Sequence, residues 1–232
     1  MIDDGSLRDG SEQTLRAALA QFVPQLAQVV LRINPTIPSP DPDWWAGSAV
    51  IDERYFVKFA WSAEKAAMHA REGILLDRLA SVALKLPLPE LVAFTEAPVL
   101  VVTKLLHGGP LTWEWQDRMT RHELDAVGEQ IGSFLAQLHG LDAGLLGGLA
   151  EQTLATPAGT TLLRERFTRL VDNRRGKRVL NQCDWIDSVL TSEPDPTPGV
   201  VVHGDFHSYN QIWDWSLTKL MAVLDFRDCY RG

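Results

Sequence analysis

The pattern of apolar and polar positions in the first hundred residues alternates between helical and strand periods. Apolar side chains recur at helical spacing over residues 11–22, where Ser11 can cap the start of a helix and Pro24 can end it. A second stretch of helical composition covers residues 63–80. Apolar runs typical of strands lie at 29–33, 49–51, 55–59, 91–94 and 99–103. This order of elements predicts a small sheet accompanied by helices.

The pattern changes after Leu105. A glycine–proline cluster interrupts it, and helical runs follow at 122–139, 162–171 and 178–190. A proline-bearing loop at 192–199 then leads into a short apolar strand at 200–202. We therefore expect an α+β protein of two lobes, with an antiparallel sheet plus helix in residues 1–104 and a mainly helical lobe in residues 105–232.

Composition narrows the classes of partner. The chain has 232 residues, of which 45% are hydrophobic, enough to build a buried core. Its formal net charge of −8 opposes binding to nucleic acid and anionic membranes and mildly favours cationic ligands. No basic leader with an apolar core and no run of eighteen apolar residues occurs. We expect a cytoplasmic protein with no nucleic-acid or membrane partner, in which Cys183 and Cys229 stay reduced.

The segment VVHGDFHSYN, residues 201–210, carries the most specific chemistry. Asp205 and Asn210 stand five positions apart, and Asp225 closes an apolar strand further on. In kinase-like phosphotransferases this spacing belongs to a catalytic loop and a metal-binding aspartate. A hairpin between Asn210 and Asp225 would bring two metal-binding oxygens face to face and would leave Asp205 for an acceptor hydroxyl.

These residues resemble a known family. The HGD at 203–205, Asn210 and the LDF at 224–226 are similar to the signature of the aminoglycoside phosphotransferase family, whose relatives include choline, homoserine and fructosamine kinases. His207 fits the frequent HGDxH form of that signature. The resemblance implies a two-lobed protein-kinase-like fold and an enzyme that transfers the γ-phosphate of ATP to a hydroxyl of a small molecule. Asp205 would orient and deprotonate the hydroxyl, and Asn210 and Asp225 would hold Mg²⁺.

The resemblance also implies residues that bind the nucleotide. Lys58 lies in the expected strand and would contact the α- and β-phosphates, and Glu72 in the next helix would pair with it. Thr103 and Leu105 lie in the expected hinge, whose backbone would bind adenine. The candidates for a phosphate loop are Gly47 and Ser48, which follow two bulky tryptophans where relatives have a glycine-containing loop.

Three positions depart from protein kinases or from the family. Gly204 stands where protein kinases usually carry an arginine that reads a phosphorylated loop, which favours a small-molecule kinase without that switch. Arg227 stands two positions after Asp225, where many relatives have an acidic residue. The chain ends at Gly232, whereas relatives continue through helices that build much of the acceptor site. We therefore expect a C-lobe that is truncated, or one that a partner chain completes.

Other interpretations concern the same residues. His203, Asp205 and His207 have the spacing of ligands in a hydrolytic metal site, although such a site leaves Asn210 and Asp225 unexplained. We predict instead that His203 and His139 are buried structural residues. The first choice of acceptor is an aminoglycoside or similar antibiotic. A metabolite kinase of the choline, homoserine or sugar type and a catalytically impaired, nucleotide-binding pseudokinase are the alternatives.

Overall fold

The computed structural model describes residues 7, 11–34, 46–82, 85–147, 164, 180–181, 183–184, 187–188 and 200–231. The chain divides into two compact units, one from residues 1–140 and 203–229 and the other from residues 141–202 and 230–232. Most of the expected helices at 162–171 and 178–190 and all of the loop at 192–199 lie outside the described residues. The lobe boundary near Leu105 stays a prediction.

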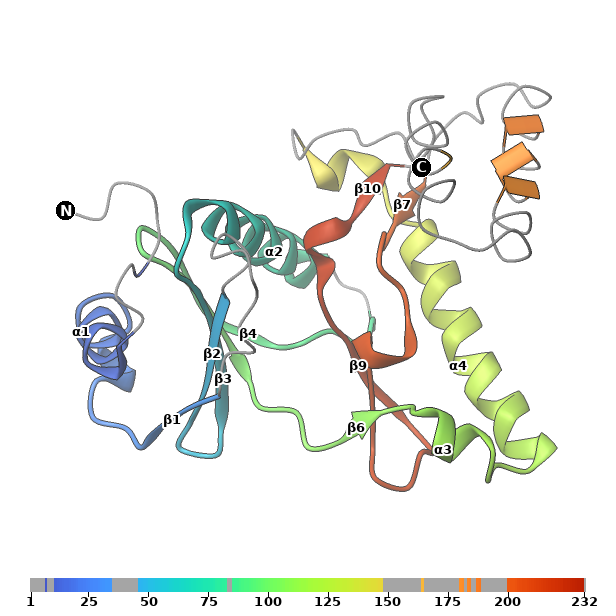
Figure 1. Ribbon diagram of the computed structural model, residues 1–232, viewed down its shortest axis with the longest axis horizontal. Helices are drawn as coiled ribbons and strands as arrows, with labels where there is room; N and C mark the ends of the chain where they lie inside the picture. The colour runs from blue at the N-terminus through green and yellow to red at the C-terminus, as the bar shows by residue number, and fades with distance from the viewer. Residues whose placement is uncertain are drawn as a thin grey trace. The chain divides into compact units, whose positions relative to one another are not determined.

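The first unit contains a five-stranded antiparallel sheet (Figure 1). In spatial order its strands are β1 (Leu31–Ile33), β2 (Ala46–Ile51), β3 (Tyr55–Ala60), β5 (Val99–Lys104) and β4 (Leu91–Glu96). Each of the five predicted strands is present. The first is shorter than expected, because Val30 is exposed and its amide donates to the side chain of Asp52 rather than to a neighbouring strand.

Two helices pack on this sheet. Helix α1 (Glu12–Phe22) begins at the predicted cap, where Ser11 accepts a hydrogen bond from the amide of Thr14, and the 3₁₀ turn η1 (Pro24–Leu26) follows it. Apolar side chains of α1 share one core with the sheet, including Leu15, Leu19, Val57, Phe59, Leu100 and Val102. Helix α2 (Ala63–Ser81) starts at its own serine cap, Ser62. Because Val57 and Phe59 face the α1 core, the strand alternation sends Lys58 to the opposite face.

Helix α2 approaches the sheet closely at one glycine. A Cβ atom built on Gly73 would overlap the ring of Phe94 in β4. A glycine at this position therefore lets the helix lie directly against the strand. The neighbouring residue, Glu72, is buried in the interior and is 2% exposed.

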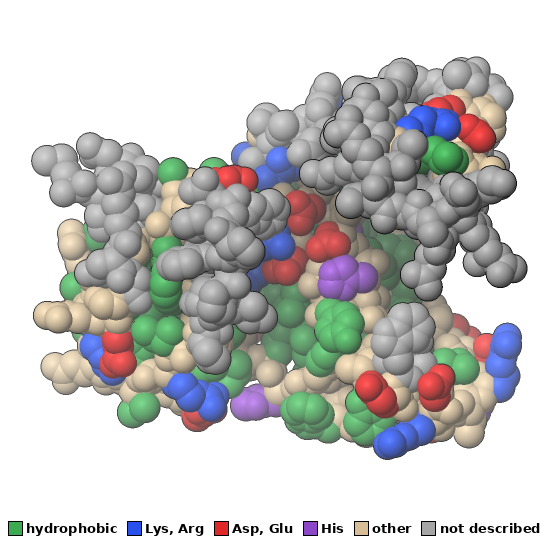
Figure 2. All heavy atoms as spheres, viewed as in Figure 1, with side chains coloured by type: hydrophobic (Ala, Val, Ile, Leu, Met, Phe, Trp, Pro, Cys, Tyr) green, Lys and Arg blue, Asp and Glu red, His purple; other side chains and the backbone are tan. Residues whose placement is uncertain are grey.

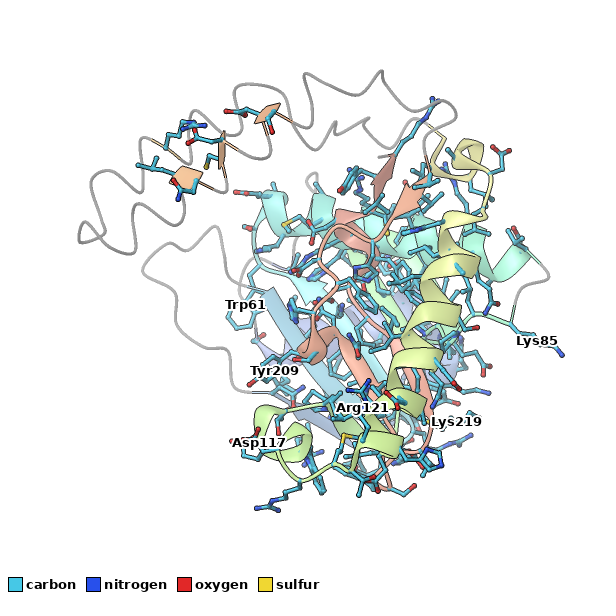
Figure 3. The ribbon with its side chains drawn as sticks, turned by 90° about the vertical axis from the view of Figure 1, so that its right-hand side faces the viewer. Trp61, Lys85, Asp117, Arg121, Tyr209 and Lys219 are labelled. Carbon is cyan, nitrogen blue, oxygen red and sulfur yellow. The ribbon has the colours of Figure 1, made fainter. Side chains whose placement is uncertain are left out.

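The rest of the first unit carries the predicted hairpin. Strand β6 (Gly109–Pro110) pairs with β8 (Gln211–Trp213), which pairs with β9 (Leu220–Val223). The short helix α3 (Trp113–Gln116) precedes α4 (Arg121–His139), which begins with a capping box at Thr120 and Glu123. The Gln130 side chain joins α4 to the hairpin, donating to the Thr218 carbonyl and accepting from the Leu220 amide, both at 2.9 Å. Figure 3 labels Arg121 at the start of α4 and Lys219 in the hairpin.

The histidine at the end of α4 corrects one prediction. His139 is exposed rather than buried, because it lies on the opposite side of the helix from its buried residues, Val127, Phe134 and Leu138.

The second unit has few described residues. Strand β7 (Val201–Val202) pairs antiparallel with β10 (Tyr230–Arg231), and the 3₁₀ turn η3 (Ala143–Leu146) follows residue 141. Arg164 forms ion pairs with Asp184 and Asp187 at 2.8 and 2.7 Å. Within the described parts of both units, no helix is long and apolar enough to cross a membrane.

Candidate active site

Lys58 lies at the centre of an ion-pair cluster. Its Nζ donates to both carboxylate oxygens of Glu72, at 2.8 and 2.9 Å, and also contacts Oδ1 of Asp225. The three residues come from β3, from α2 and from the end of β9. The structure therefore brings together the predicted lysine, the predicted glutamate and one predicted metal ligand.

The charges of this cluster stabilise one another. Burial by itself raises the pKa of Glu72, but the charge of Lys58 and hydrogen bonding outweigh burial and lower that pKa to about 2. Burial by itself lowers the pKa of Lys58, but the attraction of Glu72 and Asp225 raises it above its ordinary value. Lys58 and Glu72 are therefore charged at neutral pH, and the lysine lies between the carboxyl groups of Glu72 and Asp225.

Asp225 has an unusual backbone. It adopts a left-handed conformation, with φ 61° and ψ 53°, directly before the 3₁₀ turn η5 (Phe226–Asp228). Such a conformation costs free energy for a non-glycine residue and is often found at functional sites. The conformation turns the chain sharply after β9 and places the carboxylate beside Lys58. On its other side, Nη2 of Arg227 lies 4.0 Å from Oδ2 of Asp225.

The predicted catalytic loop is held by its own hydrogen bonds. The Asn210 side-chain nitrogen donates to the Asp205 carbonyl at 2.9 Å and to Asp205 Oδ2 at 3.2 Å. Asn210 ends the 3₁₀ turn η4 (Ser208–Asn210), and its carbonyl accepts from the Leu224 amide at 2.8 Å. That bond joins the backbone of Asn210 to the residue before Asp225, so the hairpin returns the chain as the spacing predicted.

The buried side chain of His203 also joins the catalytic loop to the residue before Asp225. It is 1% exposed, its Nε2 lies 2.8 Å from the Leu224 carbonyl, and its Nδ1 accepts from the Asp205 amide at 3.3 Å. Burial lowers the pKa of His203, which keeps the ring neutral. Since the backbone uses both ring nitrogens, His203 is the structural histidine that we predicted. It has no nitrogen left for a metal, so the hydrolytic-site interpretation is wrong.

Gly204 fits a narrow space. Its φ is +85°, and a Cβ atom there would overlap the backbone carbonyl oxygen of Asp228. A residue with a side chain would have to adopt an unfavourable conformation and push η5 away from the catalytic loop. This contact gives a physical reason for a glycine at position 204. It adds to the earlier observation that protein kinases usually carry an arginine there, which reads a phosphorylated loop.

Asn210 and Asp225 have the donor atoms that suit Mg²⁺. The side-chain nitrogen of Asn210 donates to Asp205, so the side-chain oxygen of Asn210 is the atom that can bind a metal. The carboxyl group of Asp225 supplies further oxygens. Mg²⁺ commonly takes one or two protein oxygens and completes its shell with phosphate and water. Among the described residues, no group of three or more His, Cys, Asp and Glu side chains could hold a metal ion. The oxygens of Asn210 and Asp225 are therefore of the kind that Mg²⁺ binds.

The other predicted nucleotide residues lie in the sheet. Ser48 stands directly opposite Lys58 in the β2–β3 pair, and its hydroxyl accepts from the Asn34 side chain at 3.0 Å. A Cβ atom on Gly47 would overlap the Phe59 and Trp61 rings, so this glycine makes room for aromatic packing. Glycine at this position is thereby explained without a ligand.

The predicted hinge residues are partly engaged already. Thr103 in β5 pairs with Phe56 in β3, and the Leu105 amide donates to the Arg54 carbonyl at 2.8 Å. The Leu105 amide is therefore used within the fold. A contribution of this segment to adenine binding would have to come from other backbone groups.

Two residues of α2 were missed from the sequence. Arg71 donates to the carbonyl of Cys229, and this hydrogen bond joins α2 to the segment after Asp225. Nδ1 of His69 lies 3.8 Å from Glu72 Oε2, beyond hydrogen-bond range, and burial lowers the pKa of the ring. The three-residue spacing of His69 and Glu72 was a signal that they share a helix face. No sequence signal identified the partner of Arg71.

Both cysteines are free and buried. Burial raises the pKa of Cys229 to about 12, so its thiol stays protonated and unreactive. This agrees with the predicted role of small apolar residues.

Comparisons with known proteins identify the family and the fold. The model of a family described as "Phosphotransferase enzyme family" matches residues 41–232. No curated protein shows significant sequence similarity to the chain.

Solved structures show the same fold. Aminoglycoside 2'-phosphotransferase-IIIa in its GDP complex is 14% identical with a TM-score of 0.74, over 96% of this chain and 74% of that chain. An ADP-bound aminoglycoside phosphotransferase, APH(2'')-Ib, is 20% identical with a TM-score of 0.68, over 96% and 72%. A macrolide 2'-phosphotransferase from Brachybacterium faecium is 22% identical with a TM-score of 0.58, over 88% and 67%. The predicted fold of the kinase-like antibiotic phosphotransferases is thus confirmed.

Proposed function

The chain belongs to the phosphotransferase enzyme family, and from that premise we propose that it transfers the γ-phosphate of ATP, with Mg²⁺, to a hydroxyl group of a small molecule. The observation that carries the proposal is the placement of Lys58, Nζ of which contacts both Glu72 and Asp225. A lysine between a helix glutamate and a metal-binding aspartate is the phosphate-positioning arrangement of kinases. Figure 2 shows acidic, basic and histidine side chains gathered in one area of the described surface.

Each residue has a distinct role in the proposed reaction. Lys58, held by Glu72, would bind the α- and β-phosphates, and Asn210 and Asp225 would hold Mg²⁺, which neutralises charge on the phosphates. Asp205 would accept the proton of the acceptor hydroxyl as the new oxygen–phosphorus bond forms and the bond to the β-phosphate oxygen breaks. The Asp205 side chain is 40% exposed, so an acceptor can reach it.

Binding of the nucleotide would exchange partners at Lys58 and Asp225. Lys58 contacts Asp225 in the structure. With nucleotide bound, Lys58 would contact the phosphates instead of Asp225, and Asp225 would then be available to hold Mg²⁺. Glu72 would keep its bond to the lysine throughout, which preserves the position of the ammonium group.

The proposed acceptor is an aminoglycoside or a similar antibiotic. The net charge of −8 favours a cationic acceptor. One solved relative is a streptomycin–ATP ternary complex, which supports both the class of acceptor and ATP as donor. A metabolite kinase acting on choline, homoserine or a sugar is the second candidate, and ATP consumption with those acceptors but with no antibiotic would favour it. A cytoplasmic location fits either acceptor and stays part of the proposal.

The first experiment is calorimetric titration of the chain with ATP and with GTP, each with and without Mg²⁺. Metal-dependent binding in the wild type, lost in Asp225→Ala and kept in Asp205→Ala, would support the assignment of roles. A screen of acceptors that measures nucleotide consumption then follows, with Asp205→Ala as the inactive control.

Two outcomes would contradict the proposal. Equal nucleotide affinity in the wild type and in Asp225→Ala would overturn the metal site. Metal-dependent binding without a phosphorylated product from any acceptor would favour a nucleotide-binding pseudokinase instead.

A further inference from the structure

His207 lies beside the proposed catalytic base but has no role in the mechanism above. It caps the η4 turn, where its Nδ1 accepts a hydrogen bond from the Tyr209 amide at 3.2 Å. The other ring nitrogen, Nε2, lies 3.5 Å from Oδ1 of Asp205. One imidazole therefore contacts both the backbone of the loop and the carboxylate that the loop presents.

The bond to the Tyr209 amide determines the tautomer of the ring. A neutral imidazole has one N–H group, and a nitrogen that accepts a hydrogen bond carries no proton. Because Nδ1 of His207 is the acceptor, the hydrogen resides on Nε2. Nε2, which lies 3.5 Å from Oδ1 of Asp205, is therefore a donor rather than an acceptor.

Each oxygen of Asp205 then lies near a different nitrogen donor. Asn210 donates to Oδ2 at 3.2 Å, and Nε2 of His207 lies near Oδ1. The terminal torsion of an aspartate is broad, so a single donor leaves the carboxylate free to rotate. Two donors on opposite oxygens restrict that rotation. The 3.5 Å distance between Nε2 and Oδ1 exceeds a hydrogen bond, so a small rotation of either side chain would be needed to form one.

The surroundings of His207 favour a functional role. The side chain is 49% exposed, and the aromatic contact that the structure gives it is an edge-on one with Tyr209, at 6.2 Å between ring centres. His203 in the same motif differs, since it is 1% exposed and packs against Phe206 and Phe226. His203 therefore stabilises the core, whereas the position of His207 contributes little to the core.

We propose that His207 is a positioning residue that holds the Asp205 carboxylate in its reactive orientation through Nε2–H, in the tautomer set by the Tyr209 amide. The inference rests on the proposed function, because it assigns Asp205 as the base. It concerns orientation and not proton uptake, since Nδ1 is already occupied.

Two substitutions separate the two contacts of the ring. Asparagine places an oxygen near the position of Nδ1, so His207→Asn keeps the cap on the Tyr209 amide and loses the donor to Asp205. Glutamine reaches as far as Nε2, so His207→Gln keeps a donor for Asp205 and loses the cap.

We expect His207→Asn to lower kcat by roughly 10–100-fold, as loss of a supporting hydrogen-bond partner does elsewhere, with nucleotide affinity unchanged. We expect His207→Gln to retain most of the turnover that His207→Asn loses. The reverse order would show that His207 is only a cap and would overturn the inference.

A second measurement does not require an active enzyme. Nitrogen-15 NMR of the histidine side chains, with the His207 signals identified by their loss in His207→Gln, reports which nitrogen carries the hydrogen. We expect a protonated Nε2 and an unprotonated Nδ1, and a shift of the Nε2 signal in Asp205→Ala. The opposite tautomer, or no shift, would overturn the inference. If no acceptor is found for the wild type, the proposed function fails, while the NMR result still decides the contact between His207 and Asp205.

Discussion

The Lys58 ammonium donates to both carboxylate oxygens of Glu72, at 2.8 and 2.9 Å, although Glu72 is almost completely buried. A carboxylate is costly to bury unless it is paired. The pKa of Glu72, lowered to about 2, reflects that pairing. The contact between β3 and α2 is therefore both a component of the site and a source of stability.

The first prediction concerns Glu72 and pH. The pKa of Glu72 is depressed in the folded state, so its contribution to stability is complete above the unfolded value of 4.5 and is lost as pH falls toward about 2. A shift of this size corresponds to roughly 3 kcal/mol. Glu72→Gln should lose on the order of 3 kcal/mol of unfolding free energy at pH 7 and should depend less on pH between 5 and 2, as measured by urea denaturation.

The control for Glu72 lies on the same helix. Asp77 is exposed on α2, so Asp77→Asn should change stability by less than about 0.5 kcal/mol. A Glu72→Gln variant with the same pH dependence as the wild type would show that the pairing contributes nothing to acid unfolding.

The second prediction separates neighbouring aspartates. Asp225 contacts Lys58, whereas Asp228, three positions on, pairs with Arg227 at 3.3 Å. Asp225→Asn should weaken Mg²⁺–nucleotide binding by roughly 10–100-fold and change metal-free nucleotide binding little. Asp228→Asn should leave both affinities within about threefold of the wild type, because an exposed ion pair contributes little. Similar losses in the two variants, measured by calorimetry, would refute the assignment of Asp225.

The third prediction concerns Arg227, which stands where many relatives carry an acidic residue. Its guanidinium lies 4.0 Å from Oδ2 of Asp225 and would compete with the proposed Mg²⁺ for that oxygen. Arg227→Ala should lower the Mg²⁺ concentration needed for half-maximal nucleotide binding by roughly two- to fivefold, as expected for removal of a partly exposed charge. The measurement is nucleotide binding at fixed nucleotide and varied Mg²⁺. An unchanged or higher requirement for Mg²⁺ would mean that Arg227 does not compete for Asp225.

The fourth prediction compares two glycines. Gly204 has a positive φ and no room for a Cβ atom, so Gly204→Ala should destabilise the protein by roughly 3 kcal/mol. Gly132 lies inside α4 with no atom within 4 Å of a built Cβ, and Gly132→Ala should stabilise the protein by about 0.5–1 kcal/mol. Thermal and urea denaturation measure both changes. A Gly204→Ala variant as stable as the wild type would show that the loop adapts without strain.

The sequence predicted the parts of the site that depend on spacing. The family resemblance identified Lys58 in a strand and Glu72 in the next helix, and the five-residue spacing placed Asp205 and Asn210 in one short loop. Each of these positions is determined by local geometry, and the structure brings Lys58 and Glu72 together as expected. His203 was predictable for the same reason, since a histidine next to an apolar strand usually finds a backbone partner inside.

Other features depend on contacts between distant segments. The left-handed conformation of Asp225 and the bond between Arg71 and the Cys229 carbonyl depend on how η5 packs against α2, which no local pattern shows. The Leu105 amide is used by Arg54 because of the strand register, which residue types alone do not determine. His139 was misjudged because apolar neighbours in sequence lie on a different side of a helix.

Three consecutive residues of α2 are each attached to something different. Arg71 binds the carbonyl of Cys229, Glu72 binds Lys58, and Gly73 lies against Phe94. Many protein kinases switch themselves off by swinging the corresponding helix outward, which breaks the lysine–glutamate pair. Here such a swing would break three contacts within one helical turn. We therefore expect α2 to keep its position, so that occupancy of the proposed site would depend on the supply of its ligands rather than on a signal that moves the helix.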